Sequence, residues 1–133
     1  MLGSSPAFST FAVPDIDVAR SFYGDTLGLQ VQGPNEMGLI DLHLATGARV
    51  SVYPKPDHRP AVFTVLNFLV PDIDRAVDEL RAKGVEMETY DIDGLEADDK
   101  GIHRGRGPAI AWFTDPAGNI LSVIEDPEGQ RQD

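Results

Sequence analysis

The sequence contains no cysteine in its 133 residues, which excludes disulfide frameworks, thiolate metal sites and cysteine nucleophiles. It also lacks a run of the roughly 18 apolar residues that a membrane-spanning helix needs. The opening residues MLGSSPAFST have neither the basic start nor the apolar stretch of a signal peptide. Together these absences predict a cytoplasmic protein that does not enter a membrane.

Basic residues are scarce, since 11 Lys and Arg stand against 22 Asp and Glu and the formal net charge is −11. Nucleic acids and anionic membranes need a basic surface, so neither is an expected partner. Acidic groups that line a cleft would attract a cationic small molecule. Acidic groups spread over the surface would serve solubility alone, and the sequence leaves both interpretations open.

Familiar catalytic motifs are missing as well. The sequence contains no G-x-S-x-G nucleophile elbow and no H-E-x-x-H zinc motif. Gly101, Gly105 and Gly107 do not lie between a predicted strand and a predicted helix, so they do not indicate a phosphate-binding loop. The sequence therefore reveals no nucleophile constellation.

An internal repeat organises the chain. Residues 13–19 read VPDIDVA and residues 70–76 read VPDIDRA. The ends of the two copies also match, because VSVY at 50–53 parallels LSVI at 121–124. One copy is too short to bury a sufficient core alone, so the two are expected to pack together.

Each copy predicts the element order βαβββ. The predicted strands span 7–13, 38–44 and 49–53 in the first copy and 62–70, 109–113 and 119–124 in the second. The predicted helices span 15–27 and 72–83. Asp15 and Asp72 are natural helix N-caps, and Gly28 and Gly84 lie where a helix C-cap needs a left-handed residue. The fold class is therefore α+β.

The repeat also predicts the domain organisation, a single domain over 1–133 that is built from two modules. Residues 7–53 form the first module and residues 62–125 the second, with 54–61 as a linker and 126–133 as a tail. The glycine-rich segment 92–108 is expected to be a loop. It is either a lid over a site or an ordinary surface loop.

Two motifs carry a resemblance to a known family. VPDID at 13–17 is followed by SFY at 21–23 and LGL at 27–29, and WFTDPAGN at 112–119 looks like an F-x-D-P-x-G-N hairpin. Over about 7–125 the sequence resembles the vicinal oxygen chelate superfamily of glyoxalases, bleomycin resistance proteins and extradiol dioxygenases. The resemblance implies tandem βαβββ modules whose cup-shaped mixed sheets line a small-molecule cavity, and it implies a homodimer.

Metal-dependent members of this superfamily hold a divalent ion with His and Glu side chains on the first and last strands of each module. Carried over onto this sequence, the first-strand positions are Phe8 and Val65, and the last-strand positions are Ser51 and Ser122. None of these side chains is a usual ligand for such an ion. We therefore expect no metal and no other cofactor, unless a divalent ion uses a non-standard site.

Strand alternation separates the side chains that pack on each helix from those on the opposite face of the sheet. If Ile40, Leu42 and Val52 face the first helix, then Asp41 and His43 point the other way. The opposite face is predicted to be polar in the first module and apolar and aromatic in the second. The ligand-binding candidates on these faces are Phe8, Thr10, His43, Arg49, Ser51, Tyr53, Asn67, Trp112 and Ser122.

Each candidate has a purely structural alternative. His43 is the best candidate for a general base or a ligand because imidazole titrates near neutrality, but it also suits a strand position opposite Asp41 or Arg49. Trp112 would stack on a planar or cationic molecule, or else pack at a dimer contact. Arg49 and Tyr53 would orient a ligand oxygen, or form an ordinary cross-strand pair.

Other side chains have weaker functional interpretations. His103, Arg104 and Arg106 in the long loop would either close over a ligand or form a solvated charge cluster. His58 in the linker is expected to be structural or exposed, and Tyr23 is expected to pack the first helix on its sheet.

Two classes of function follow, and the sequence does not decide whether the protein is an enzyme. The first is metal-independent binding or sequestration of a small molecule, cationic or aromatic, of the bleomycin-resistance type. The second is a lyase, isomerase or dioxygenase with a non-standard site around His43. A domain whose ligand is another protein is a third possibility.

Overall fold

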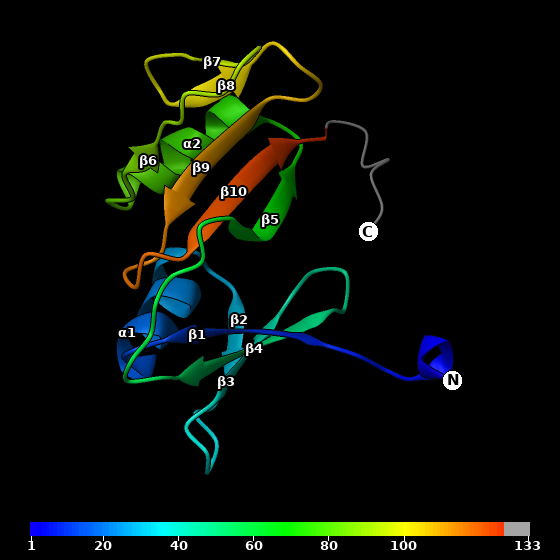
Figure 1. The fold of residues 1–133 in the computed structure, drawn as a ribbon. Helices are drawn as coiled ribbons and strands as arrows, with labels where there is room; N and C mark the ends of the chain where they lie inside the picture. The colour runs from blue at the N-terminus through cyan, green and yellow to red at the C-terminus, as the bar shows by residue number, and fades with distance from the viewer. Residues whose placement is uncertain (127–133) are drawn as a thin grey trace. The chain divides into compact units, whose positions relative to one another are not determined.

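The computed structural model describes residues 1–126, so the predicted tail lies outside the described residues except for Asp126. The chain divides into two compact units, Met1–Pro60 and Ala61–Asp133, and Figure 1 shows that each contains a sheet and a helix. None of the helices in the described part of the chain is long and apolar enough to cross a membrane.

The first unit is a four-stranded mixed sheet with one helical segment. Its elements are η1 (Leu2–Ser4), β1 (Ser9–Val13), α1 (Ile16–Ser21), η2 (Phe22–Thr26), β2 (Gln30–Gln32), β3 (Ile40–His43) and β4 (Arg49–Pro54). The strand order is β1-β4-β3-β2. β1 runs parallel to β4 and the other pairs are antiparallel.

The second unit repeats this plan and adds to it. Its elements are β5 (Thr64–Val70), α2 (Ile73–Ala82), β6 (Met87–Glu88), β7 (Glu96–Ala97), β8 (Ile102–Arg104), β9 (Ile110–Thr114) and β10 (Ile120–Glu125). The strand order is β5-β10-β9-β8-β7, and β6 also pairs with β9. β5 runs parallel to β10, as β1 does to β4.

Both helices begin at the predicted caps. The carboxylate of Asp15 accepts the backbone N–H groups of Asp17 and Val18 at 3.0 and 3.2 Å. The carboxylate of Asp72 accepts the N–H of Arg75 at 3.1 Å. These bonds satisfy donors that the first helical turn leaves unpaired, so the two copies of the repeat begin their helices in the same way.

The end of the first helix differs from the continuous helix predicted over 15–27. The α-helix stops after six residues and Phe22–Thr26 is π-helical. Tyr23 in this wider turn has no exposed surface, and its ring lies 5.8 Å from that of Phe11. Tyr23 therefore packs the helical segment on the sheet as predicted. Gly28 has a φ of +77°, the left-handed conformation expected at this end.

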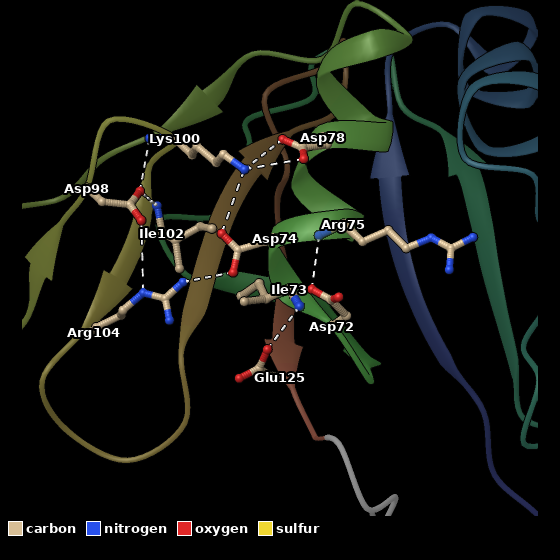
Figure 2. Close-up of polar contacts among 10 residues, drawn as sticks. All are labelled: Asp72, Ile73, Asp74, Arg75, Asp78, Asp98, Lys100, Ile102, Arg104 and Glu125. Carbon is tan, nitrogen blue, oxygen red and sulfur yellow. Dashed lines mark hydrogen bonds and ion pairs between the residues drawn. The ribbon is translucent and has the colours of Figure 1, made fainter.

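The segment 92–108 is not a loop, and this prediction is wrong. It contains the hairpin of β7 and β8, and β8 extends the sheet by pairing with β9. Figure 2 shows how the hairpin is held on α2. Lys100 Nζ lies 3.0 Å from Asp78, and the Arg104 guanidinium lies 3.2 Å from Asp74. The strands were missed because each is only two or three residues long among glycines.

Alternate strand residues form the core, as the alternation predicted. In the first unit Ile40, Leu42 and Val52 have no exposed surface. In the second unit Ala111 and Leu121 have none either, and the C-terminal strands contact α2. The intervening residues of each strand therefore lie on the face of the sheet opposite the helix, which we call the open face.

Candidate functional site

The open face of the second unit is centred on Trp112 of β9. This side chain is partly buried, and its indole N–H donates a hydrogen bond of 3.1 Å to the hydroxyl of Thr64. The Tyr90 ring lies 5.3 Å from the indole at 77°, and the His103 ring lies 4.8 Å from it at 78°. Such edge-to-face contacts are favourable geometries for aromatic pairs, so the three rings form one cluster.

His103 holds this cluster in place. The backbone N–H of Tyr90 donates to its Nε2 at 3.2 Å, and its Nδ1 lies 3.1 Å from the carbonyl oxygen of Gly101. Nε2 also lies 3.3 Å from the carbonyl oxygen of Tyr90, so both ring nitrogens lie within hydrogen-bond distance of the backbone. His103 has no exposed surface. Its interpretation as part of a solvated loop cluster is therefore wrong, because His103 lies on β8 and packs against the Trp112 ring.

Arg104 and Arg106, the other two charges predicted for this segment, are exposed and bond within their own unit. Arg104 bonds to Asp74 of α2 at 3.2 Å. Arg106 donates to the carbonyl oxygen of Asp93 at 3.0 Å. Both guanidinium groups therefore hold the hairpin or the segments beside it in place, and neither bonds to a residue of the open face.

The serines at the implied last-strand ligand positions make matching contacts in the two units. The Ser51 hydroxyl donates to Asp41 at 2.6 Å, and the Ser122 hydroxyl donates to Asn67 at 2.5 Å. Ser51 and Ser122 are buried, with 3% and 0% of their surface exposed. Each hydroxyl is thus bonded to a neighbouring strand within its own sheet.

The residues at the four implied positions do not fit the superfamily's metal. Phe8 precedes β1 and is 54% exposed, and Val65 is an aliphatic residue on β5. Neither they nor the two serines supply the imidazole or carboxylate donors that a borderline or hard divalent ion needs. Within residues 1–126 no three His, Asp or Glu side chains are grouped so as to hold a metal ion.

The open face of the first unit is polar and more exposed. The guanidinium of Arg49 lies 4.1 Å from the centre of the Phe8 ring, a cation–π contact. Thr10 is the register partner of Ser51 and lies exposed on the edge strand. Tyr53 is 37% exposed. Arg49 therefore pairs with the ring of Phe8 rather than with Tyr53.

His43 lies on this same face, where its register partner is Arg49. Its Nε2 is buried and has no hydrogen-bond partner among the described residues. Asp41 bonds to Ser51, so within residues 1–126 no carboxylate orients the imidazole as a general base normally requires.

Two residues on the open face of the second unit are not among the candidates that the sequence indicates. Glu88 pairs in register with Trp112, and Tyr90 follows two residues later. Burial raises the pKa of the Tyr90 hydroxyl above its ordinary value, and the nearby charge of Glu88 raises it further. The alternation of Glu88 and Tyr90 with the apolar Met87 was the signal available, but a two-residue strand is too short to recognise.

A groove with a volume of about 500 Å³ lies elsewhere in the second unit. It runs between the C-terminal end of α2 and the tip of the β7–β8 hairpin. Its lining residues are Arg81, Gly84, Val85, Glu86, Met87, Thr89, Asp98, Asp99, Lys100 and Gly101. None of the predicted site residues lines it.

Comparison with protein families identifies the class to which this arrangement belongs. The model of the Glyoxalase/Bleomycin resistance protein/Dioxygenase superfamily matches residues 7–123. The chain therefore belongs to this superfamily, and the family resemblance in its motifs is confirmed. Comparison with curated protein sequences finds no significant match.

Solved structures with the same fold include proteins with different roles. A glyoxalase family protein from Enterococcus faecalis has 23% identity and a TM-score of 0.67, covering 94% of this chain and 100% of its own. TnmS3, an antibiotic binding protein from Streptomyces sp. CB03234, has 19% identity and a TM-score of 0.66, covering 92% and 97%. The fosfomycin resistance protein FosX from Listeria monocytogenes has 13% identity and a TM-score of 0.68, covering 97% and 98%.

Proposed function

We propose that the protein binds a small organic molecule on the open face of its second module, against Trp112, without using a metal. The observation that carries this proposal is the aromatic cluster, in which Trp112 stays partly exposed although its N–H is satisfied by Thr64. An indole with no unmet hydrogen bond offers a ligand the part of its apolar ring that stays exposed. Stacking on such a ring contributes about 0.5–1.5 kcal/mol beyond the area buried.

The surroundings of Trp112 suit such a ligand. Ile110, Ile120 and Ile124 alternate with core residues on β9 and β10 and are partly buried. The bonded pair of Ser122 and Asn67 adds polar atoms to the same face. Apolar walls with a few fixed polar groups are typical of small-molecule sites.

The comparisons support this choice within the superfamily. TnmS3 is an antibiotic binding protein and FosX is a fosfomycin resistance protein, so the fold accommodates proteins that act on small molecules. The absence of His and Glu at the four implied ligand positions favours the binding role over the metal-dependent chemistry.

Fluorescence tests the proposal directly, because Trp112 is the only tryptophan of the chain. Titration with planar aromatic compounds is expected to quench or shift its emission. In calorimetry, Trp112→Ala is expected to weaken the same binding at least about tenfold, the effect of losing about 1.4 kcal/mol. Met37→Ala, at a position that is 77% exposed in the first unit, is the control.

Two outcomes would contradict the binding proposal. One is unchanged affinity in the Trp112→Ala variant. The other is a stoichiometric divalent metal in elemental analysis of protein purified without added metal or chelator.

A second candidate is an enzyme of the same superfamily, a lyase, isomerase or dioxygenase, that uses His43. Two observations favour it together: the Nε2 of His43 is buried and unpartnered among the described residues, as that of His58 also is, and His43 alone of the two lies on a strand of the sheet. Leaving such a group without a hydrogen bond costs about 1–3 kcal/mol. A substrate that bonded to Nε2 would remove this cost. His43→Ala should then abolish turnover or weaken binding, whereas His58→Ala should not. Unchanged behaviour of His43→Ala would remove this candidate.

We also propose a homodimer in the cytoplasm, as the superfamily resemblance and the sequence composition imply. These two statements are independent of the site at Trp112.

A further inference from the structure

We propose that the ligand is an organic ammonium ion, held between the carboxylate of Glu88 and the rings of Tyr90 and Trp112. This inference rests on the proposed binding at Trp112 and names the chemical class that the site selects.

The first argument is geometric. The antiparallel pairing of β6 with β9 places Glu88 directly opposite Trp112. Directly opposite residues of an antiparallel pair project on the same face with their Cβ atoms about 4.5–5.5 Å apart. Tyr90 follows on the same side, and its ring touches the indole at a centroid distance of 5.3 Å. One carboxylate and two aromatic rings therefore lie together on the open face.

The second argument is that Glu88 lacks a countercharge. It is partly buried, and no ion pair joins it to a cation in residues 1–126. The cations of the nearby hairpin are bound elsewhere: Lys100 contacts Asp78, and Arg104 contacts Asp74. Figure 2 shows both on the helix side of the sheet. A partly desolvated carboxylate without a partner favours a cation supplied from outside.

The third argument concerns the kind of cation. The Tyr90 and Trp112 rings meet edge to face at 77°, so the edge of one ring packs against the other, and the ring faces outside this contact attract ammonium groups through their quadrupoles. A single carboxylate supplies only a small part of the roughly six to eight oxygen ligands that Ca²⁺ takes, and within residues 1–126 no three His, Asp or Glu side chains are grouped so as to hold a metal ion. His103 completes the cluster, because its ring nitrogens contact the backbone of Tyr90 and Gly101.

The test uses benzyltrimethylammonium and its uncharged carbon isostere, neopentylbenzene, read by Trp112 fluorescence on the full chain. The ammonium ion is expected to bind at least about tenfold more tightly than the isostere. Glu88→Gln is expected to remove most of this preference. Glu86→Gln makes the same change of charge two residues earlier, at a residue that lines the separate groove, and should retain the preference.

The outcomes separate this inference from the proposal on which it rests. If both compounds bind equally and Glu88→Gln has no effect, binding at Trp112 stands and the ammonium ion is wrong. If neither compound changes the fluorescence, the ammonium inference is also overturned, while the wider aromatic screen decides the binding proposal. Thermal melting of Glu88→Gln checks folding, and no change is expected because Glu88 has no ion-pair partner among the described residues.

Discussion

At the scale of single residues, His103 shows how one side chain can determine a local arrangement. It is fully buried, contacts the Trp112 ring and accepts a hydrogen bond from the backbone of Tyr90. The position of both aromatic residues on the open face therefore depends on it.

Replacement of His103 by alanine should consequently disturb both stability and the site. We expect a loss of about 2–4 kcal/mol in the free energy of unfolding, because a cavity forms and the Tyr90 N–H loses its acceptor. The emission of Trp112 should move to longer wavelength as water reaches the indole. Chemical denaturation and fluorescence measure the two effects. His58→Ala, a histidine deletion in the first unit, should change neither by a comparable amount.

Asp115 is a second residue whose role is local, in the hairpin that joins β9 to β10. Its buried carboxylate accepts the backbone N–H groups of Ala117 and Asn119, both at 2.9 Å, and the Asn119 amide at 3.0 Å. Asp115→Ala leaves these donors unmet and should cost about 2–3 kcal/mol in unfolding free energy. Asp115→Asn should cost less, since it keeps one acceptor oxygen. A similar loss in both variants would contradict this explanation.

At the scale of elements, the β7–β8 hairpin depends on its attachment to α2. Lys100 reaches Asp78 at 3.0 Å and Asp74 at 3.7 Å. The hydrogen bond to Asp78 raises the pKa of Lys100 above its ordinary value of 10.5. Because the pKa is raised in the folded state, this attachment is complete at neutral pH and is lost only as the pH rises through the raised pKa of Lys100.

Asp74→Asn should loosen the hairpin without unfolding the unit, because Asp74 serves both Lys100 and Arg104. Amide hydrogens of β7 and β8 are expected to exchange several-fold faster, whereas those of β10 should not. High salt should produce a weaker version of the same change in the unaltered protein, since these charges are solvent-exposed. Equal acceleration in β10 would show that the hairpin is not a separate element.

At the scale of the whole molecule, the two units share one plan but differ in their open faces. That of the first unit is polar and exposed, with Arg49 over Phe8. That of the second is aromatic and partly buried, with Trp112 at its centre. The repeat therefore preserved the scaffold while the side chains on the two faces diverged.

The proposed homodimer is tested at this scale. Light scattering is expected to give twice the mass of the chain at micromolar concentrations. With a formal net charge of −11, two copies repel one another at long range. The dimer should therefore strengthen when salt screens this repulsion. A monomer at every salt concentration would contradict the proposal.

The sequence by itself determined the features that depend on residues close together in the chain. The caps at Asp15 and Asp72 need only the next three residues, and the division of each strand into two faces follows from alternation. The repeat and the two family motifs then identified the superfamily, which the family model confirms.

Only the tertiary structure decided which distant residues meet. The short strands β6 and β8 carry too few residues to show a period, so their pairing with β9 could not be recognised. That pairing buries His103 and places Glu88 and Tyr90 beside Trp112. The physical reason is that hydrogen bonds between strands are long-range contacts, and they are made only when the chain is folded.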